Sequence, residues 1–331
     1  MDFKYGSIWR KWDLHVHTPM SILYENYTLN EDEKDEFLKC IGNDFDNNEV
    51  KMYYFIKQLF NKAIQNNIAA IGITDYFFID GYKFIKKILQ EKSKLKLIFK
   101  QELSKDSNYL NKINEILLVP NVEFRTDVVI SEKKEGKSTQ SKLQVHVIFS
   151  DELDVETIEQ NFINALKFST GDDELQLTKN NVQKFGKNIK ESDIGGKGND
   201  ILVGANSIAI KIEDLNEICS KKEFKDKAII VLAEEDQSIM KWEGQAGAIR
   251  QKYYKICDAI FTSNDKTIKW CLSEICKETI GKQLPYLWGS DAHDFKKIFA
   301  VDNDKFCWIK ADTTFDGLLY ALYRFNNRIF I

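Results

Sequence analysis

The sequence has four histidines, and each lies in or directly after an apolar run. His15 and His17 stand one residue apart in RKWDLHVHTP, and His293 follows Asp291 at the same spacing in WGSDAHD. On an extended strand, side chains two positions apart point to the same side. Imidazole is the commonest metal ligand in proteins. The set therefore predicts metal binding, although a single strand histidine such as His146 is more often a hydrogen-bonded core residue.

Two carboxylates extend this candidate centre. Asp75 ends the run AAIGITD, and Glu123 lies within VPNVEFR. A carboxylate after a buried strand is costly unless it is paired or bound to metal, while a helix cap or an ion pair is the ordinary alternative for each. Mixed histidine and carboxylate ligands suit Zn²⁺, Mn²⁺ or Fe rather than Ca²⁺. Ions held together lower the pKa of a bound water and clamp phosphoryl oxygens, which predicts phosphoester chemistry.

The elements that position these residues alternate between short apolar runs and helical patterns, which favours an α/β fold with parallel strands. Helices are predicted at 53–67, 80–90 and 155–168. About seven strands separated by helices favour a closed barrel, whose sites lie at the carboxyl ends of the strands. The predicted strands are 12–17, 69–74, 116–124, 143–149, 228–233, 259–263 and 285–290, followed by a further apolar run at 306–311.

Composition narrows the class of protein. The chain has 331 residues, 43% hydrophobic and 30% charged, with a net charge of -4, so it lacks the overall basic surface of a duplex-binding protein. The first residues, MDFKYGSIWRKWD, do not form a signal peptide, and no apolar run reaches the roughly 18 residues of a membrane span. We expect a cytoplasmic protein without membrane contact. Its six cysteines include no C-x-x-C pair, which predicts reduced thiols.

The ordered motifs of this chain resemble those of the PHP (polymerase and histidinol phosphatase) family. The resemblance rests on Asp13-Leu14-His15-Val16-His17, Thr74-Asp75, Glu123, His146 and Ser290-Asp291-Ala292-His293. It implies a distorted seven-stranded (β/α) barrel of PHP type and a metal-dependent phosphoesterase. We expect residues 1–331 to form a single PHP domain with loop insertions near 25–50, 131–142 and 169–200.

The resemblance also implies roles for individual residues. Asp75 and His293 would be further metal ligands or proton carriers, and a metal-bound hydroxide would be the nucleophile. Glu123 would bridge two ions. The ligands of the first ion would be His15, His17, Glu123 and Asp291, and His146 would hold the second.

The third ion of the fullest PHP site lacks two of its ligands in this chain. No histidine follows His17 closely, and Tyr76 stands directly after Asp75 where the family has a histidine. Near the second ion, Glu234 in VLAEED occupies the place of a frequent histidine, with an exposed charge as the alternative. We therefore expect two divalent ions (Mn, Zn or Fe) and a third site that is empty, weak or dependent on substrate.

Basic residues are candidates for binding the substrate. Arg125 and Arg250 could receive phosphate oxygens, with Arg250 as a candidate catalytic residue, although a surface ion pair is the commoner role of an arginine. Lysines in the segment 131–142 could hold a nucleic acid strand, whereas the interleaved Glu132 and Glu135 favour a solvated loop. These lysines are Lys133, Lys134, Lys137 and Lys142.

A wider resemblance links the chain to the N-terminal part of TrlF-type AAA-like ATPases, in which a PHP domain precedes an SMC-like ATPase. It is carried by GSIWRKWDLHVHTP, VLAEEDQSIMKWEGQ, FTSNDKTIKW and FCWIKADTTFDGL. The chain has no G-x-x-x-x-G-K-[ST], and its GGKG run predicts only a flexible loop. An ATPase partner would lie beyond Ile331 or in another chain.

By analogy with such partners, we expect a nuclease acting on DNA or RNA, with a role in antiviral (phage) defence. Two alternatives stay open at this stage. One is a small-molecule phosphatase of histidinol-phosphatase type. The other is a metal-stabilised sensor or interaction module that serves an ATPase and turns over little substrate.

Overall fold

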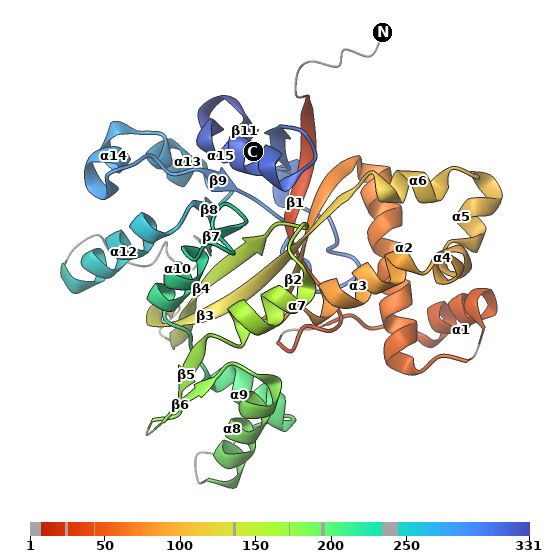
Figure 1. The fold of residues 1–331 in the computed structure, drawn as a ribbon, viewed down its shortest axis with the longest axis horizontal. Helices are drawn as coiled ribbons and strands as arrows, with labels where there is room; N and C mark the ends of the chain where they lie inside the picture. The colour runs from red at the N-terminus through yellow and green to blue at the C-terminus, as the bar shows by residue number, and fades with distance from the viewer. Residues whose placement is uncertain are drawn as a thin grey trace.

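The computed structural model describes residues 8–23, 26–42, 44–134, 137–171, 173–192, 196–233 and 244–331, with the backbone alone at 130–134, 137–141 and 302. Its centre is a nine-stranded sheet with the strand order β11-β10-β1-β2-β3-β4-β7-β8-β9. Figure 1 shows this sheet in the middle of the molecule with helices around it. The chain is a mixed α/β protein with a barrel-like sheet, as the alternation of apolar runs predicts.

Each of the expected apolar runs overlaps a strand, and several strands extend beyond the expected bounds. The sheet consists of β1 (Trp9–His17), β2 (Ile68–Tyr76), β3 (Leu117–Lys134), β4 (Lys137–Phe149), β7 (Ala228–Ala233), β8 (Ala259–Phe261), β9 (Tyr286–Leu287), β10 (Cys307–Lys310) and β11 (Ile329–Phe330). A separate two-stranded sheet joins β5 (Lys167–Ser169) and β6 (Glu174–Gln176). The strand predictions were accurate because buried strands are apolar on both faces.

The expected number and direction of the strands need correction. The sheet has nine strands instead of seven, because β10 and β11 extend it antiparallel beyond β1. β4 runs antiparallel to both β3 and β7, not parallel. No helix separates β3 from β4 along the chain, and a parallel return needs a crossover of about a dozen residues or more.

The barrel-like part of the sheet closes at the C-terminal half of β1. The His17 amide donates to the carbonyl oxygen of Ala292 at 3.0 Å, and Val16 and Ala292 form a parallel bridge. A Cβ at Gly289 would lie 2.6 Å from the Cβ of His15, so this approach of the two chain segments requires glycine. The segment after β9 therefore lies against the strand that carries the H-x-H motif.

Helices cover the outside of the sheet (Figure 1). Their bounds are α1 (Glu31–Ile41), α2 (Asn47–Asn66), α3 (Asp80–Gln90), α4 (Lys92–Ile98), α5 (Lys100–Lys105), α6 (Tyr109–Asn114), α7 (Val155–Thr157), α8 (Lys179–Glu191), α9 (Asp200–Ser207), α10 (Ile212–Cys219), α12 (Gly244–Ile256), α13 (Asp265–Cys271), α14 (Glu274–Ile280) and α15 (Phe315–Tyr323). Short helical turns are η1 (Ile158–Ile163), η2 (Asp302–Asp304) and η3 (Phe325–Asn327).

The helical predictions differ in accuracy. The range 80–90 coincides with α3, and the apolar face expected for 53–67 is buried in α2. α2 begins earlier because Asp46 caps it by accepting hydrogen bonds from the amides of Asn48 and Glu49. The helix expected over 155–168 is wrong at its end, since η1 is a π-helix and residues 167–169 form β5.

The three segments expected as insertions contain regular structure. Residues 25–50 include α1 and the start of α2, and 169–200 include β6 and α8. The backbone of 131–142 continues the β3–β4 ladder as far as the pair Lys134 and Lys137. The single-domain division stays a prediction. No helix among the described residues is long and apolar enough to cross a membrane.

Candidate metal centre

β1 places His15 and His17 on the same side of the sheet, while Leu14 and Val16 are buried on the other side. The Nε2 atoms of the two imidazoles are 3.1 Å apart. His17 is fully buried, and the side chain of His15 is 12% exposed. Two imidazole lone pairs at this distance repel each other unless a proton or a metal ion lies between them. The strand alternation thus brings the two imidazoles together, and their role as ligands stays a prediction.

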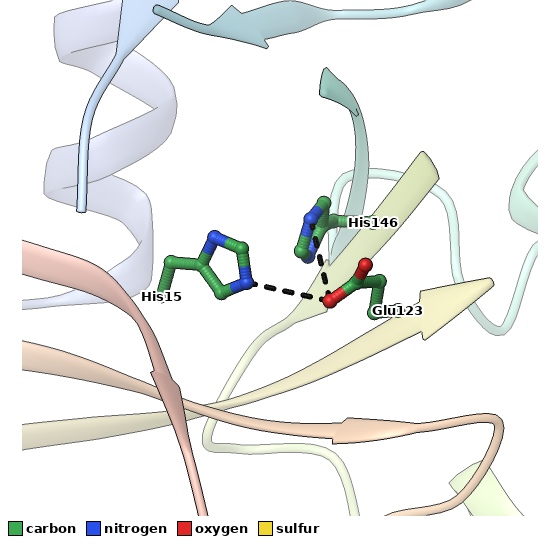
Figure 2. Close-up of side chains that lie close together, drawn as sticks. All are labelled: His15, Glu123 and His146. Carbon is green, nitrogen blue, oxygen red and sulfur yellow. Dashed lines mark ion pairs between the residues drawn. The ribbon is translucent and has the colours of Figure 1, made fainter. Parts of the chain in front are cut away.

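Glu123 and His146 complete the inner part of the cluster from β3 and β4. Their Cα atoms are register partners in the antiparallel ladder. One Glu123 oxygen, Oε2, lies 3.0 Å from His17 Nε2, 3.3 Å from His15 Nε2 and 3.9 Å from His146 Nε2. Figure 2 shows the imidazoles of His15 and His146 both turned towards this carboxylate. Glu123 therefore faces three imidazoles at once.

Asp291 and His293 approach from the segment after β9. Asp291 Oδ1 lies 3.2 Å from His15 Nε2, 3.6 Å from His17 Nε2 and 3.1 Å from His293 Nε2. Asp291 has a φ of 46°, in the left-handed region that non-glycine residues adopt rarely. The bend turns a half-exposed carboxylate towards β1. Strain of this kind is concentrated at functional sites.

The donor atoms fit a divalent metal ion. Among the described residues, two groups have ligand atoms within 4.8 Å of one another: His15, Glu123 and His146, and His15, His17 and Asp291. His146 Nε2 is buried without a hydrogen-bond partner among the described residues, and the buried Glu123 Oε2 lies within hydrogen-bond distance of the His15 and His17 imidazoles. Buried polar atoms are normally satisfied, so this convergence of lone pairs suits a bound cation. Neutral imidazoles and carboxylates match Zn²⁺, Mn²⁺ or Fe.

Neighbouring polar groups fix the ligands in orientations suited to metal binding. His146 Nδ1 lies 3.2 Å from Asn121 Oδ1, an acceptor that assigns the ring proton to Nδ1 and leaves Nε2 as the free ligand. His17 Nδ1 lies 3.5 Å from Ser21 Oγ. The carboxylate of Asp13 accepts hydrogen bonds from the amides of His15 and Ser290, which joins the two ligand-bearing segments.

The electrostatics favour unprotonated ligands at most positions. Burial lowers the pKa of His17 to about 4 and that of His146 to about 3. Burial would raise the pKa of Glu123, but the imidazoles, His146 first, hold it well below its usual range. Burial also opposes protonation of His15, yet Asp291 and Glu123 together raise its pKa to about 9. Metal binding would compete with protonation of His15.

Asp75 is not brought into either ligand group. Its Oδ1 accepts a hydrogen bond from Thr18 Oγ1 at 2.6 Å, and its Oδ2 accepts one from the Gly81 amide at 2.7 Å. It is 2% exposed, and burial raises its pKa to about 7. Asp75 thus connects the end of β1 to the first turn of α3, a contact that sequence alone could not distinguish from metal ligation.

The remaining candidates fall in different places. Arg250 lies on α12, where its Nη2 donates to the Tyr254 hydroxyl at 3.0 Å. Glu234 lies outside the described residues. Tyr76 is at the centre, since its ring stacks on His17 with 4.9 Å between the centroids.

Two residues at the centre were missed by sequence reasoning. The ring of Phe261, at the end of β8, packs on His15 and His146 with centroid distances of 5.4 and 4.9 Å. The other is Asn121, the partner of His146. Its position two residues before Glu123 on the same strand face was the available signal.

Comparisons with known proteins found matches among solved structures only. No protein-family model matches the chain, and no curated protein does. A solved structure from Bifidobacterium adolescentis, described as a "putative metal-dependent phosphoesterase", aligns over 95% of this chain and 96% of its own, with 10% sequence identity and a TM-score of 0.40. Similarity at this level carries no information about chemistry, so the assignment of the site depends on its own geometry.

Proposed function

We propose that the protein is a metal-dependent hydrolase acting on phosphoester bonds. The observation that carries this proposal is the convergence of imidazole and carboxylate groups from β1, β3, β4 and the segment after β9, with His146 Nε2 buried and without a hydrogen-bond partner among the described residues. His15 belongs to both ligand groups, and Glu123 lies beside three imidazoles. Two divalent ions sharing Glu123 suit this arrangement. Tyr76 lies beside them, where the fullest site of this kind has a ligand of a third ion.

The chain supplies binding, orientation and proton handling. Divalent ions bound here would supply Lewis acidity, lowering the pKa of a water and neutralising phosphoryl oxygens. Asn121 and Asp13 orient the ligands from outside the cluster. His293, 3.1 Å from Asp291 and with an 18% exposed side chain, is the proposed proton carrier to solvent. Asp75 serves in this proposal as a positioning residue for β1.

For the substrate, we propose a phosphodiester of DNA or RNA. The support is the resemblance to proteins in which this kind of domain precedes an SMC-like ATPase, from which an ATPase partner, a cytoplasmic location and a role in antiviral defence are also proposed. A phosphomonoester of histidinol-phosphate type is the alternative substrate. A sensor module without turnover is the alternative function.

The decisive experiment is a substrate screen with metal-depleted protein reloaded with Mn²⁺, Zn²⁺ or Mg²⁺. We expect metal-dependent cleavage of single-stranded or duplex nucleic acid, weakened by rising salt, and none from a His15→Ala variant. Cleavage of small phosphomonoesters alone would overturn the nuclease assignment. Tight metal binding with no release from any phosphoester would favour the sensor module.

A further inference from the structure

Arg125 continues the ligand-bearing face of β3 beyond Glu123. Side chains two apart on a strand share a face, so Asn121, Glu123 and Arg125 point the same way. Register agrees, since Glu123 pairs with His146 and Arg125 pairs with Gln144. Arg125 is only 8% exposed. The Arg125 guanidinium is thus held on the same face of β3, two residues from the Glu123 carboxylate of the metal centre.

Contacts on both sides fix the position of this guanidinium. Its Nη1 donates to Asn206 Oδ1 at 2.9 Å, and its Cζ lies 5.7 Å from the centroid of the Tyr76 ring. The same ring stacks on His17. Arg125 and the metal ligand His17 therefore pack on one common side chain, which couples the place of the cation to the place of the ligand.

Asn206 belongs to a lobe formed by α8 and α9, which Figure 1 shows apart from the other helices, beside β5 and β6. The lobe attaches to the sheet around Arg125. The Ile210 amide donates to the Arg125 carbonyl at 2.9 Å, and Lys142 Nζ donates to the carbonyls of Ser207 and Ile208 at 3.1 and 2.6 Å. Lys142 thereby satisfies the C-terminal end of α9.

The two helices of the lobe, α8 and α9, pack closely against each other. A Cβ at Gly204 of α9 would lie 2.0 Å from the carbonyl oxygen of Val182 in α8, so the two helices touch backbone to backbone. A second cation, Lys142, lies where the lobe meets the sheet. Burial, and after it the charge of Arg125, lowers the pKa of Lys142 to about 8. Two neighbouring cations raise the positive potential on this side of the centre.

We propose that Arg125 binds a phosphate oxygen of the substrate, and that the α8–α9 lobe sets its position through Asn206. This inference rests on the proposed phosphoesterase function. A planar guanidinium matches two oxygens of a phosphate, which a lysine cannot do. The oxygens belong either to the phosphate that is hydrolysed or to its neighbour in a polynucleotide, and the two sources share the same chemistry.

The test compares Arg125→Lys and Asn206→Ala with Arg10→Lys in metal-loaded protein. Arg10 is a matched control because it is half-buried at the start of β1, where its Nη1 donates to the Ala311 carbonyl at 2.7 Å. Binding of inorganic phosphate is measured by calorimetry, and kcat and KM are measured for p-nitrophenyl phosphate and for a phosphodiester carrying a neighbouring phosphate. Metal content and thermal unfolding show whether each variant is intact.

Arg125→Lys should weaken phosphate binding and raise KM by about ten- to a hundredfold with unchanged metal content, because a hydrogen bond to a charged group is lost. Asn206→Ala should change both in the same direction, by about three- to tenfold. A loss for inorganic phosphate and p-nitrophenyl phosphate assigns Arg125 to the hydrolysed phosphate. A loss confined to the longer phosphodiester assigns it to the neighbouring phosphate.

The inference would be overturned if phosphate affinity and the KM for both esters were within about twofold of the Arg10→Lys values in Arg125→Lys and in Asn206→Ala. This result is distinct from failure of the proposed function, in which wild-type protein shows no metal-dependent hydrolysis at all. If Arg125→Lys does not fold, Asn206→Ala carries the test, because it keeps the guanidinium and removes the side chain that accepts from its Nη1.

Discussion

Two buried carboxylates on adjacent strands of this protein have opposite surroundings. Asp75 lies near the end of β2 and Glu123 in β3, where Glu123 pairs with Tyr76, the residue after Asp75. Both carboxylates are almost inaccessible to solvent. Asp75 accepts two short hydrogen bonds from neutral donors and belongs to no candidate ligand group among the described residues. Glu123 faces three imidazoles. The comparison teaches that the donors around a buried carboxylate, and not its burial, decide between metal ligation and structural bonding.

The largest expected effect is loss of the metals from Glu123→Ala. Wild-type protein should bind roughly two equivalents of metal, and the variant should lose both ions because Glu123 lies between the two ligand groups. Activity should fall by more than the roughly 10–100-fold typical of residues outside the ligand set. Metal analysis by mass spectrometry checks this, with Glu234→Ala expected to weaken mainly the second ion. If Glu123→Ala kept both ions, Glu123 would not be a metal ligand, and its role would no longer differ from the structural role of Asp75.

The matching change at the other carboxylate should affect folding instead. Asp75→Ala leaves the Thr18 hydroxyl and the Gly81 amide without their acceptor, which should lower the free energy of unfolding by about 2–4 kcal/mol. Metal content should stay near that of the wild type. Denaturant unfolding and metal analysis of the same sample provide the check. A fully stable variant that has lost an ion would show that Asp75 is a ligand.

The pH dependence of the free energy of unfolding should differ between the wild type and Asp75→Asn, whose side chain has nearly the same shape but does not titrate. Because burial raises its folded-state pKa from 3.8 to about 7, the stability that comes from its protonated form is fully present below pH 3.8 and is lost as pH rises through 7. Relative to Asp75→Asn, the wild type should therefore lose about 1–3 kcal/mol between pH 4 and pH 7. Unfolding curves of metal-depleted protein at several pH values test this, and parallel pH profiles would contradict it.

The smallest expected effect concerns the hydrogen bond behind a ligand. Asn121→Ala should weaken metal binding by about tenfold, because His146 Nδ1 loses the acceptor that orients its ring. Competition with a chelator measures the change. Asn61→Ala is a suitable control, since the Asn61 side chain donates to Glu102 between α2 and α5 and lies outside both candidate ligand groups. Equal affinities for the two variants would mean that backbone position alone orients His146.

Much of the fold was accessible from sequence because buried strands form continuous apolar runs. The run at 228–233 coincides with β7, and each of the others overlaps a strand. The direction of β4 and the addition of β11 were not accessible, because a short apolar run does not encode its pairing partner. η1 escaped prediction because six residues are too few for their apolar pattern to distinguish a π-helix from an α-helix.

The sequence by itself determined which side chains can act together within one segment. The spacing of His15 and His17, and of Asp291 and His293, places each pair on one side of an extended chain, because the side-chain period of a strand is two. Only the tertiary structure decided which of these segments meet. The ladder that sets Glu123 opposite His146, the left-handed turn at Asp291 and the contact of Asp75 with Thr18 depend on pairings between residues far apart in the chain. Local periodicity cannot specify such pairings, because they are fixed by packing of the whole sheet.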